Sequence, residues 1–334
     1  MRSVFAVVAV LSVLCLCVAA QAVVMETVAV GNAGNAADTR YGIHGSVAYN
    51  YNIGKYEVTT VQYTEFLNAK ARTDAYGLWN ASMANTGTVP EGYGCNIQRS
   101  GASGSYTYTV GSGSSADVAA WGNRPVNYVS FWDACRFVNW LDNGEGNGDT
   151  ETGAYTLGGY IGSDGRAIQR NAGRQWAVTS DDEWYKAAYY KGGGTDAGYW
   201  DYATQSDIVP IAAGPTGSAN RANYNFECTG TTRVGAYTGS ASAYGTFDQN
   251  GNVWEWDESL PYISYASPSR GARGGSFTYY GDGYLRASDS VGWFPSSEYN
   301  ALGFRVSQTA PEPSSVIALA GGVISLFAIR RRRA

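Results

Sequence analysis

The sequence predicts an α+β fold with little regular secondary structure. Its 334 residues include 43 glycines, 26 tyrosines and 10 tryptophans, and turn signals occur along most of the chain. Long stretches of regular apolar spacing are rare, so we expect a loop-rich domain with a few short helices and strands.

Three segments have the apolar spacing of short helices. The first covers residues 60–69, where the apolar side chains fall mostly on one side. The second begins at Ser130 and the third at Ser180, and each serine is followed three residues later by an acid, Asp133 or Glu183. This spacing predicts a capping box, in which the serine and the acid each bond a free backbone N–H of the first turn.

The expected strands are short. Residues 51–56, 175–179 and 303–306 are β-like runs bounded by turn residues. The glycine- and serine-rich residues 101–115 are interpreted as an exposed loop or hairpin.

Residues 1–22 are typical of a signal peptide. Arg2 precedes an apolar run over residues 4–20, which closes on the cleavage pattern Ala20-Gln21-Ala22. A buried core helix, the alternative, does not explain that triplet. We therefore expect an exported protein whose body covers residues 23–310.

The C-terminal segment is typical of a membrane anchor. Residues 316–329 are apolar or small, and Arg330–Arg333 follow at once. A membrane helix needs about 20 residues and at least about 17. Adding residues 313–315 to the apolar run brings its length near this lower limit. The arginines stay on the cytoplasmic side under the positive-inside rule, whereas a helix docked on the domain leaves them unexplained.

The charge of the body excludes one class of function. Without its two ends the chain has 18 basic and 27 acidic side chains, so its net charge is near −9. Nucleic-acid binding depends on neutralising phosphates, so an acidic body without a basic run argues against it.

The reactive side chains of the body are few. Cys95, Cys135 and Cys228 remain after removal of the signal peptide, which leaves room for one disulfide, for example Cys95 with Cys228, and a free thiol. The only histidine is His44, so a histidine-based triad or a histidine-rich metal centre is not expected.

Six motifs resemble the formylglycine-generating enzyme domain, that is, the sulfatase-modifying-factor family. In order they are IGKYEVT at 53–59, RPVNYVS at 124–130, VTSDDEW at 178–184, GNVWEW at 251–256, RGGSF at 273–277 and LGFRV at 302–306. The resemblance implies a variant of the C-type lectin fold over residues 23–310.

The C-terminal tail carries a resemblance of its own. Pro311-Glu312-Pro313, the apolar run and the arginine cluster resemble the PEP-CTERM sorting signal over residues 311–334. This implies an envelope protein whose tail is processed by a membrane protease, so the membrane and that protease are expected partners.

The resemblance also locates a missing cysteine pair. In the family's aerobic enzymes two cysteines that bind copper(I) lie three and eight residues after the serine of Arg-Gly-Gly-Ser. That serine is Ser276 here, and the two positions hold Tyr279 and Tyr284. Copper(I) prefers sulfur ligands, and a phenol with a pKa of about 10 is a poor substitute. We therefore expect a non-catalytic domain without copper, and an oxidase with another metal or a different activity is the alternative.

The family resemblance implies a peptide-binding groove beside this segment. Aromatic faces with polar edges suit sugars and peptides alike, so an envelope carbohydrate or protein is the expected ligand. The alternative is that the tyrosines only fill the former active site. The groove would be lined by Ser276, Tyr279, Tyr280, Tyr284, Trp293 and Phe294.

Structural calcium is also implied by the resemblance. One site would use the carboxylates of Asp248 and Glu255 and the carbonyls of Gly251 and Val253, oxygen ligands of the kind that calcium prefers. The alternative is that Asp248 caps a turn and Glu255 makes a buried salt bridge. A second site would begin at Asn223 and the carbonyl of Tyr224, although the acid that follows in the family has no match here.

Arg305 is expected to pair with a buried carboxylate or to cap carbonyls.

Overall fold

The computed structural model describes residues 22–87, 93–261, 268–278 and 281–310. The predicted signal peptide, except its last residue, the predicted tail, and Tyr279 and Tyr280 lie outside these ranges. Across the part of the chain that is described, no helix has the length and apolar character needed to cross a membrane.

The three expected helices are present, and the second and third begin directly after the capping serines that predict them. They are α1 (Thr60–Lys70), α3 (Phe131–Asp142) and α4 (Asp181–Tyr189). Ser130 and Ser180 each form the predicted capping box, which satisfies donors that the first helical turn leaves free. A further helix, α2 (Ser115–Trp121), was not predicted, because none of its residues is buried and its apolar spacing is therefore weak.

The strands form two four-stranded sheets and two small pairs. The first sheet has the order β1-β2-β12-β5, with antiparallel neighbours throughout. The second has the order β10-β9-β8-β11, in which β8 and β11 are parallel. The hairpin β3–β4 occupies the region interpreted as loop or hairpin. The bounds are β1 Thr27–Val30, β2 Tyr51–Gly54, β3 Ile97–Ser100, β4 Thr107–Val110, β5 Trp176–Val178, β6 Ile211–Ala212, β7 Arg221–Ala222, β8 Trp254–Trp256, β9 Arg270–Arg273, β10 Val291–Trp293, β11 Leu302–Phe304 and β12 Val306–Thr309, with the 3₁₀ turns η1 Ala81–Ala84 and η2 Gly283–Leu285.

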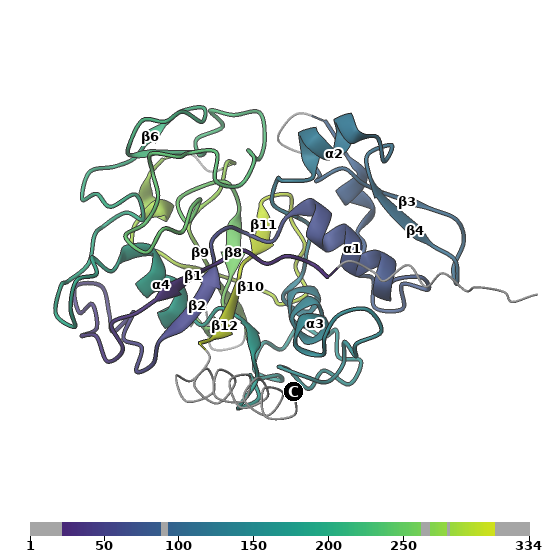
Figure 1. Ribbon diagram of the computed structural model, residues 1–334, viewed down its shortest axis with the longest axis horizontal. Coiled ribbons are helices and arrows are strands. Elements are labelled where there is room, and N and C mark those ends of the chain that lie inside the picture. The colour runs from purple at the N-terminus through teal and green to yellow at the C-terminus, as the bar shows by residue number, and fades with distance from the viewer. Residues whose placement is uncertain (1–21, 88–92, 262–267, 279–280, 311–334) are drawn as a thin grey trace, which may run out of the picture.

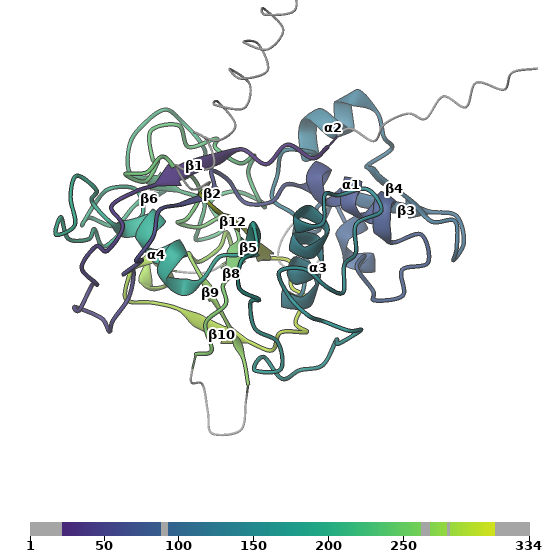
Figure 2. The same cartoon turned by 60° about the horizontal axis from the view of Figure 1, so that its bottom comes forward.

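The elements separate into two sides around the sheets. Helices α1, α2 and α3 and the hairpin β3–β4 lie on one side in Figures 1 and 2, and α4 lies on the other. The main core lies between the first side and the sheets, where the Phe137 ring is 5.4 Å from both Phe66 and Phe304. Edge-to-face packing of this kind stabilises the core beyond the burial of apolar area.

The closing motif at 302–306 differs from the expected single strand. Residues 302–304 form β11 in the second sheet, and residues 306–309 form β12 in the first. Arg305 lies at the change of sheet with its side chain fully buried. This arginine therefore connects the two sheets.

Candidate functional site

Strand β8 carries a buried ion pair at the centre of the domain. The Arg305 guanidinium donates from Nε and Nη2 to the two carboxylate oxygens of Glu255, at 2.7 and 2.6 Å, and both side chains are 0% exposed. The Trp184 indole N–H donates to Glu255 Oε2 at 2.6 Å. Arg305 also donates to the carbonyls of Gly54 and Phe247. Both expectations for Arg305, a carboxylate partner and carbonyl caps, are confirmed.

Two further buried carboxyl groups lie near this pair. Burial, together with the charges of Asp248 and Glu255, raises the pKa of Glu57 well above its usual range. Burial also raises the pKa of Asp248 to about 6. The Oε2 atom of Glu57 is buried without a hydrogen bond to any described residue. Three acids therefore lie near the single guanidinium of Arg305, which leaves an excess of two negative charges if all three are ionised. A bound divalent cation would offset this excess, and protonation of one acid would halve it.

The residues predicted for the first calcium site partly fit that role. The acidic excess favours a cation, and Asp248 sits in a turn with a φ of 63°. However, Asp248 Oδ2 accepts from the Gly235 N–H at 2.6 Å, and both oxygens of Glu255 are engaged by Arg305 and Trp184. The turn contact and the salt bridge named as alternatives are thus both present. Calcium stays a prediction, with Asp248 as its main carboxylate ligand.

The residues predicted for the second calcium site lie directly beside the first. Asn223 forms a β-bridge with Gly251, and the Asn252 N–H donates to the Asn223 carbonyl at 2.8 Å. The side-chain oxygen of Asn223 is buried and has no hydrogen-bond partner in the described ranges. The Tyr224 carbonyl accepts from the Glu227 N–H at 3.2 Å. One unused oxygen is therefore available here, without an acidic ligand.

The segment after β9 makes the tight backbone path expected of two adjacent glycines. Gly274 and Gly275 have φ values of 96° and 71°, which side-chain-bearing residues rarely adopt. Ser276 follows with 0% exposure, and its hydroxyl lies 3.1 Å from the hydroxyl of Thr278. The prediction that Ser276 lines a groove is therefore corrected, because its side chain lies beneath the surface.

Of the other predicted groove residues, Tyr284 lies in η2 and Trp293 ends β10 of the second sheet, whereas Tyr279 and Tyr280 lie outside the described residues. Tyr284 is 40% exposed and packs edge-on against Trp254 with ring centroids 5.5 Å apart. Trp293 pairs with Arg270 in the sheet register, at the end of β9 away from Ser276, and contacts Tyr299 at 4.9 Å. The described groove residues thus form two separate groups, one at Tyr284 and one at Trp293. Phe294, which follows Trp293, is 51% exposed.

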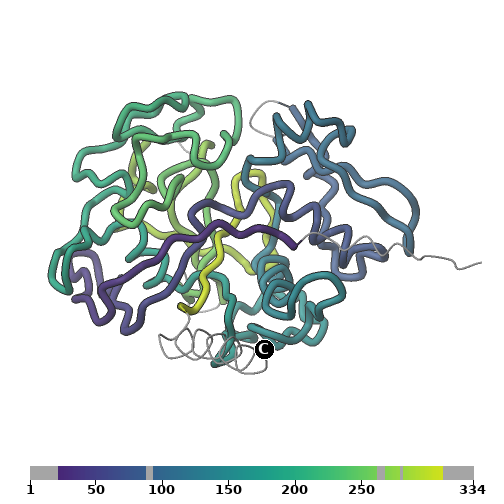
Figure 3. The backbone as a smooth tube through the Cα atoms, viewed as in Figure 1, coloured from purple at the N-terminus to yellow at the C-terminus, as the bar shows by residue number. Residues whose placement is uncertain are grey.

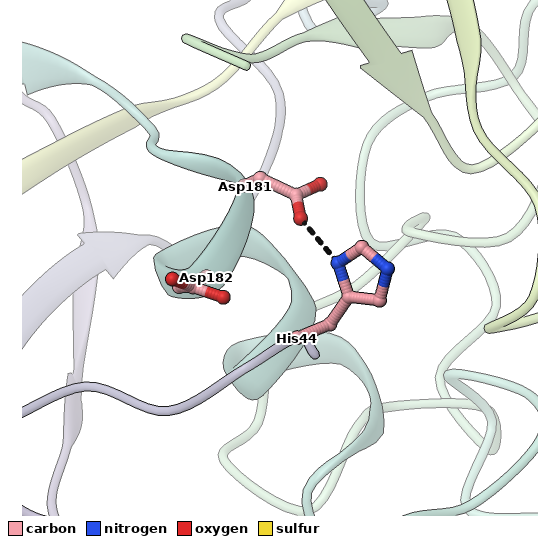
Figure 4. Close-up of side chains that lie close together, drawn as sticks. All are labelled: His44, Asp181 and Asp182. Atoms are coloured by element: carbon pink, nitrogen blue, oxygen red, sulfur yellow. Dashed lines mark hydrogen bonds and ion pairs between the residues drawn. The ribbon is translucent and has the colours of Figure 1, made fainter. Parts of the chain in front are cut away.

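A cluster that the sequence did not predict joins His44 to the start of α4 (Figure 4). The His44 Nδ1 atom lies 2.8 Å from Asp181 Oδ2, and Arg273 makes an ion pair with the other oxygen of Asp181. Asp182 accepts from the Gly45 N–H at 2.7 Å. Burial alone would raise the pKa of Asp181, but the His44 hydrogen bond and the Arg273 charge outweigh it and lower this pKa to about 2.

This cluster is better explained as an ion-pair network than as a metal centre. His44, Asp181 and Asp182 are close enough to share an ion. The guanidinium of Arg273, however, already neutralises Asp181, and the His44 nitrogen nearest Asp181 is engaged with it. The network ties the loop before β2 to α4 and to the end of β9. The only sequence signal for it was the acidic start of α4.

The three cysteines of the body differ in exposure. Cys95, Cys135 and Cys228 are all free thiols, so the possible disulfide is not formed. Cys95 and Cys135 are buried, and only Cys228 is partly exposed, with its sulfur 3.8 Å from the Tyr237 hydroxyl.

The antiparallel first sheet, the mixed second sheet, the few helices and the ordered motifs define the formylglycine-generating-enzyme-like variant of the C-type lectin fold. The chain belongs to the family of the sulfatase-modifying factor enzyme 1-like domain, whose family model matches residues 20–310.

Two solved structures have the same fold. CarF is 19% identical, with a TM-score of 0.55, and the match covers 86% of this chain and 99% of CarF. Variable protein 1 of Treponema denticola is 20% identical, with a TM-score of 0.52, and the match covers 85% of this chain and 95% of that one. At such identities the likeness concerns the fold alone.

Proposed function

We propose that this protein is an exported cell-envelope protein whose domain binds a carbohydrate or a protein partner and does not generate formylglycine. The observation that carries the proposal is the chemistry of two positions. Tyr279 and Tyr284 stand where the family's aerobic enzymes hold copper, and no cysteine occurs between Ser276 and Tyr284. Without a thiol pair, soft copper(I) has no suitable ligands there.

The exposed aromatic side chains support a binding role. Tyr284 and Phe294 are 40% and 51% exposed, and Tyr299 is 47% exposed beside Trp293. Aromatic faces remove large areas from water when a sugar or peptide stacks on them, with little loss of side-chain freedom. A binding surface at these residues needs no catalytic group.

The two chain ends support an envelope location. The signal peptide at residues 1–22 and the PEP-CTERM-like tail at 311–334 would export the body and hold it at the membrane until a protease processes the tail. Calcium would be a structural cofactor at Asp248 and the neighbouring carbonyls, where it offsets the excess of buried acid.

Binding measurements on the mature chain test this proposal. Glycan arrays and pull-downs from envelope extracts should yield a ligand that the Tyr279→Ala/Tyr284→Ala double variant binds at least tenfold more weakly. Tyr41→Ala is the matched control, because Tyr41 is a similarly exposed tyrosine, at 41%, that does not belong to the predicted groove. Equal binding by the double variant and the control would remove the predicted groove from the proposal.

An oxidoreductase of the formylglycine-generating type is the second candidate, because the chain belongs to that family. It would need a metal arrangement other than the cysteine pair. Metal analysis and oxygen uptake with cysteine-containing peptides discriminate between the two. Calcium without copper or iron, and no oxygen uptake, would exclude the oxidase.

A further inference from the structure

The chain directly after the predicted cleavage point is docked into the domain. The Val23 side chain is only 8% exposed and belongs to the main core. Its backbone N–H donates to the Glu145 Oε2 atom at 2.6 Å, and the Gln62 amide donates to the Val24 carbonyl at 2.8 Å. Figure 3 shows this first described segment crossing the face of the domain from the side of α1 towards β1. The segment is therefore part of the fold.

Two acidic side chains lie at this end of the described chain: Glu145 accepts the hydrogen bond of the Val23 nitrogen, and Glu65 lines the hollows that Ala22 also lines. Glu145 follows α3, and Glu65 projects from α1. Burial and the charge of Glu145 raise the pKa of Glu65, which shows that the two carboxylates repel each other. Among the described side chains, no lysine or arginine makes an ion pair with either acid, and the nearby Lys70 instead donates to the Asn147 carbonyl. Arg233 lines the same hollow as Val23 and Glu65, but within the described ranges it makes no ion pair with either acid, so both carboxylates lack an ion-pair partner.

Ala22 separates two hollows of about 570 and 500 Å³, and Glu65 lines both. Glu145 lines the second hollow. A charged group at the Val23 nitrogen would therefore face both acids and have room for the water molecules that complete its hydrogen bonds.

We propose that cleavage between Ala22 and Val23 creates the missing cation, and that the Val23 ammonium then pairs with Glu145, with Glu65 as a second acid nearby. The hydrolysis adds one water, leaves a carboxylate on Ala22 and gives Val23 its ammonium. The proposal depends on the proposed export of the chain in one respect, because signal peptidase has to make the cut. In the precursor the same nitrogen is a neutral amide with one donor.

The chemistry of the new terminus favours this pairing. An ammonium offers three N–H donors and a full charge, and charge-assisted hydrogen bonds are about twice as strong as neutral ones. In the uncut chain Val23 is already docked, with its N–H bonded to Glu145 and its side chain in the core. Cleavage would therefore strengthen an existing contact and hold the N-terminal segment more firmly in place.

Four versions of the purified chain test the pairing. One pair begins at Val23 and ends at residue 334, with Glu145 or with Glu145→Gln. The other pair keeps Ala22 as an additional first residue in the same two backgrounds. With Glu145 present, the version that begins at Val23 should have the higher Tm, by about 2 to 4 °C. With Glu145→Gln this difference should vanish.

Equal Tm values for the two lengths with Glu145 present, or the same difference in both backgrounds, would overturn the proposal. A second readout avoids dependence on stability. The α-amine of the folded chain should react with an amine reagent about tenfold more slowly than in the Glu145→Gln variant at neutral pH, because pairing protonates and shields it.

The export step is tested separately by N-terminal sequencing of protein secreted by the cell. A terminus other than Val23 would contradict the predicted cleavage site. The measurements on the purified chains still decide whether a Val23 ammonium pairs with Glu145, so failure of one idea is distinguishable from failure of the other.

Discussion

Replacing Arg305 by leucine should strongly destabilise the domain. The Arg305 side chain makes two bonds to the Glu255 carboxylate and one each to the Gly54 and Phe247 carbonyls, and all of it is buried. Removing it leaves the Glu255 carboxylate charged and 0% exposed, with the Trp184 indole N–H, at 2.6 Å, as its remaining side-chain donor among the described residues. Loss of one partner of a buried ion pair costs about 3 to 5 kcal/mol.

The assay is unfolding by urea, followed by tryptophan fluorescence, together with thermal unfolding. For a domain of this size the same loss lowers the Tm by roughly 10 °C. Arg166→Leu is the control, because Arg166 and its partner Asp164 are exposed, and its midpoint should not change.

The Arg305→Leu/Glu255→Leu double variant separates charge burial from packing. Two leucines remove both charges, so the double variant should be more stable than Arg305→Leu alone. A loss below about 1 kcal/mol in the single variant, or a double variant that is less stable than it, would refute the view that an unpaired buried charge dominates the cost.

Three further predictions address other parts of the molecule. A thiol reagent should label only Cys228 in the native mature chain and all three cysteines after denaturation, because Cys95 and Cys135 are buried; fast native labelling of two thiols would contradict this. Gly230→Ala should cost about 1 to 3 kcal/mol, since its methyl would meet the Tyr93 ring at 1.8 Å, whereas Gly283→Ala, with open space around it, should be neutral in the same unfolding assay. Burial raises the pKa of Glu298 to about 7, so ionisation of this carboxyl lowers the stability of the folded chain as the pH rises from about 4.5 to 7. Glu298→Gln should therefore raise the Tm at pH 8 but not at pH 4. Equal changes in Tm at both pH values would be inconsistent with that titration.

The features predicted best from the sequence were those set by neighbouring residues. Ser130 and Ser180 located two helix starts because a capping box lies within four residues. Helix α2 was missed because none of its residues is fully buried and only Trp121 packs against the main core, which leaves no clear apolar stripe. The pairing of Arg305 with a carboxylate was predictable from the family motif. His44 and Asp181 are 137 residues apart, and no local pattern connects them.

The groove was harder to predict for a different reason. The motifs show which residues correspond to the family's groove, but whether a side chain is exposed there depends on how it packs in this chain. Ser276 is fully buried, and Trp293 lies at the other end of β9. Neither fact can be derived from spacing along the chain.

The first sheet cannot be completed until β12, near the end of the described chain, has been synthesised. This strand lies between β2 and β5, and the Asn52 amide bonds the Gln308 side chain across 256 residues of sequence. Until residue 309 has been synthesised, β2 and β5 each present an unpaired edge, and such edges invite pairing with other chains. Contacts this distant in sequence also form slowly. A nascent or truncated chain that lacks these last few residues can pair β1 with β2 but cannot join that pair to β5, so chaperone protection would matter most at that stage.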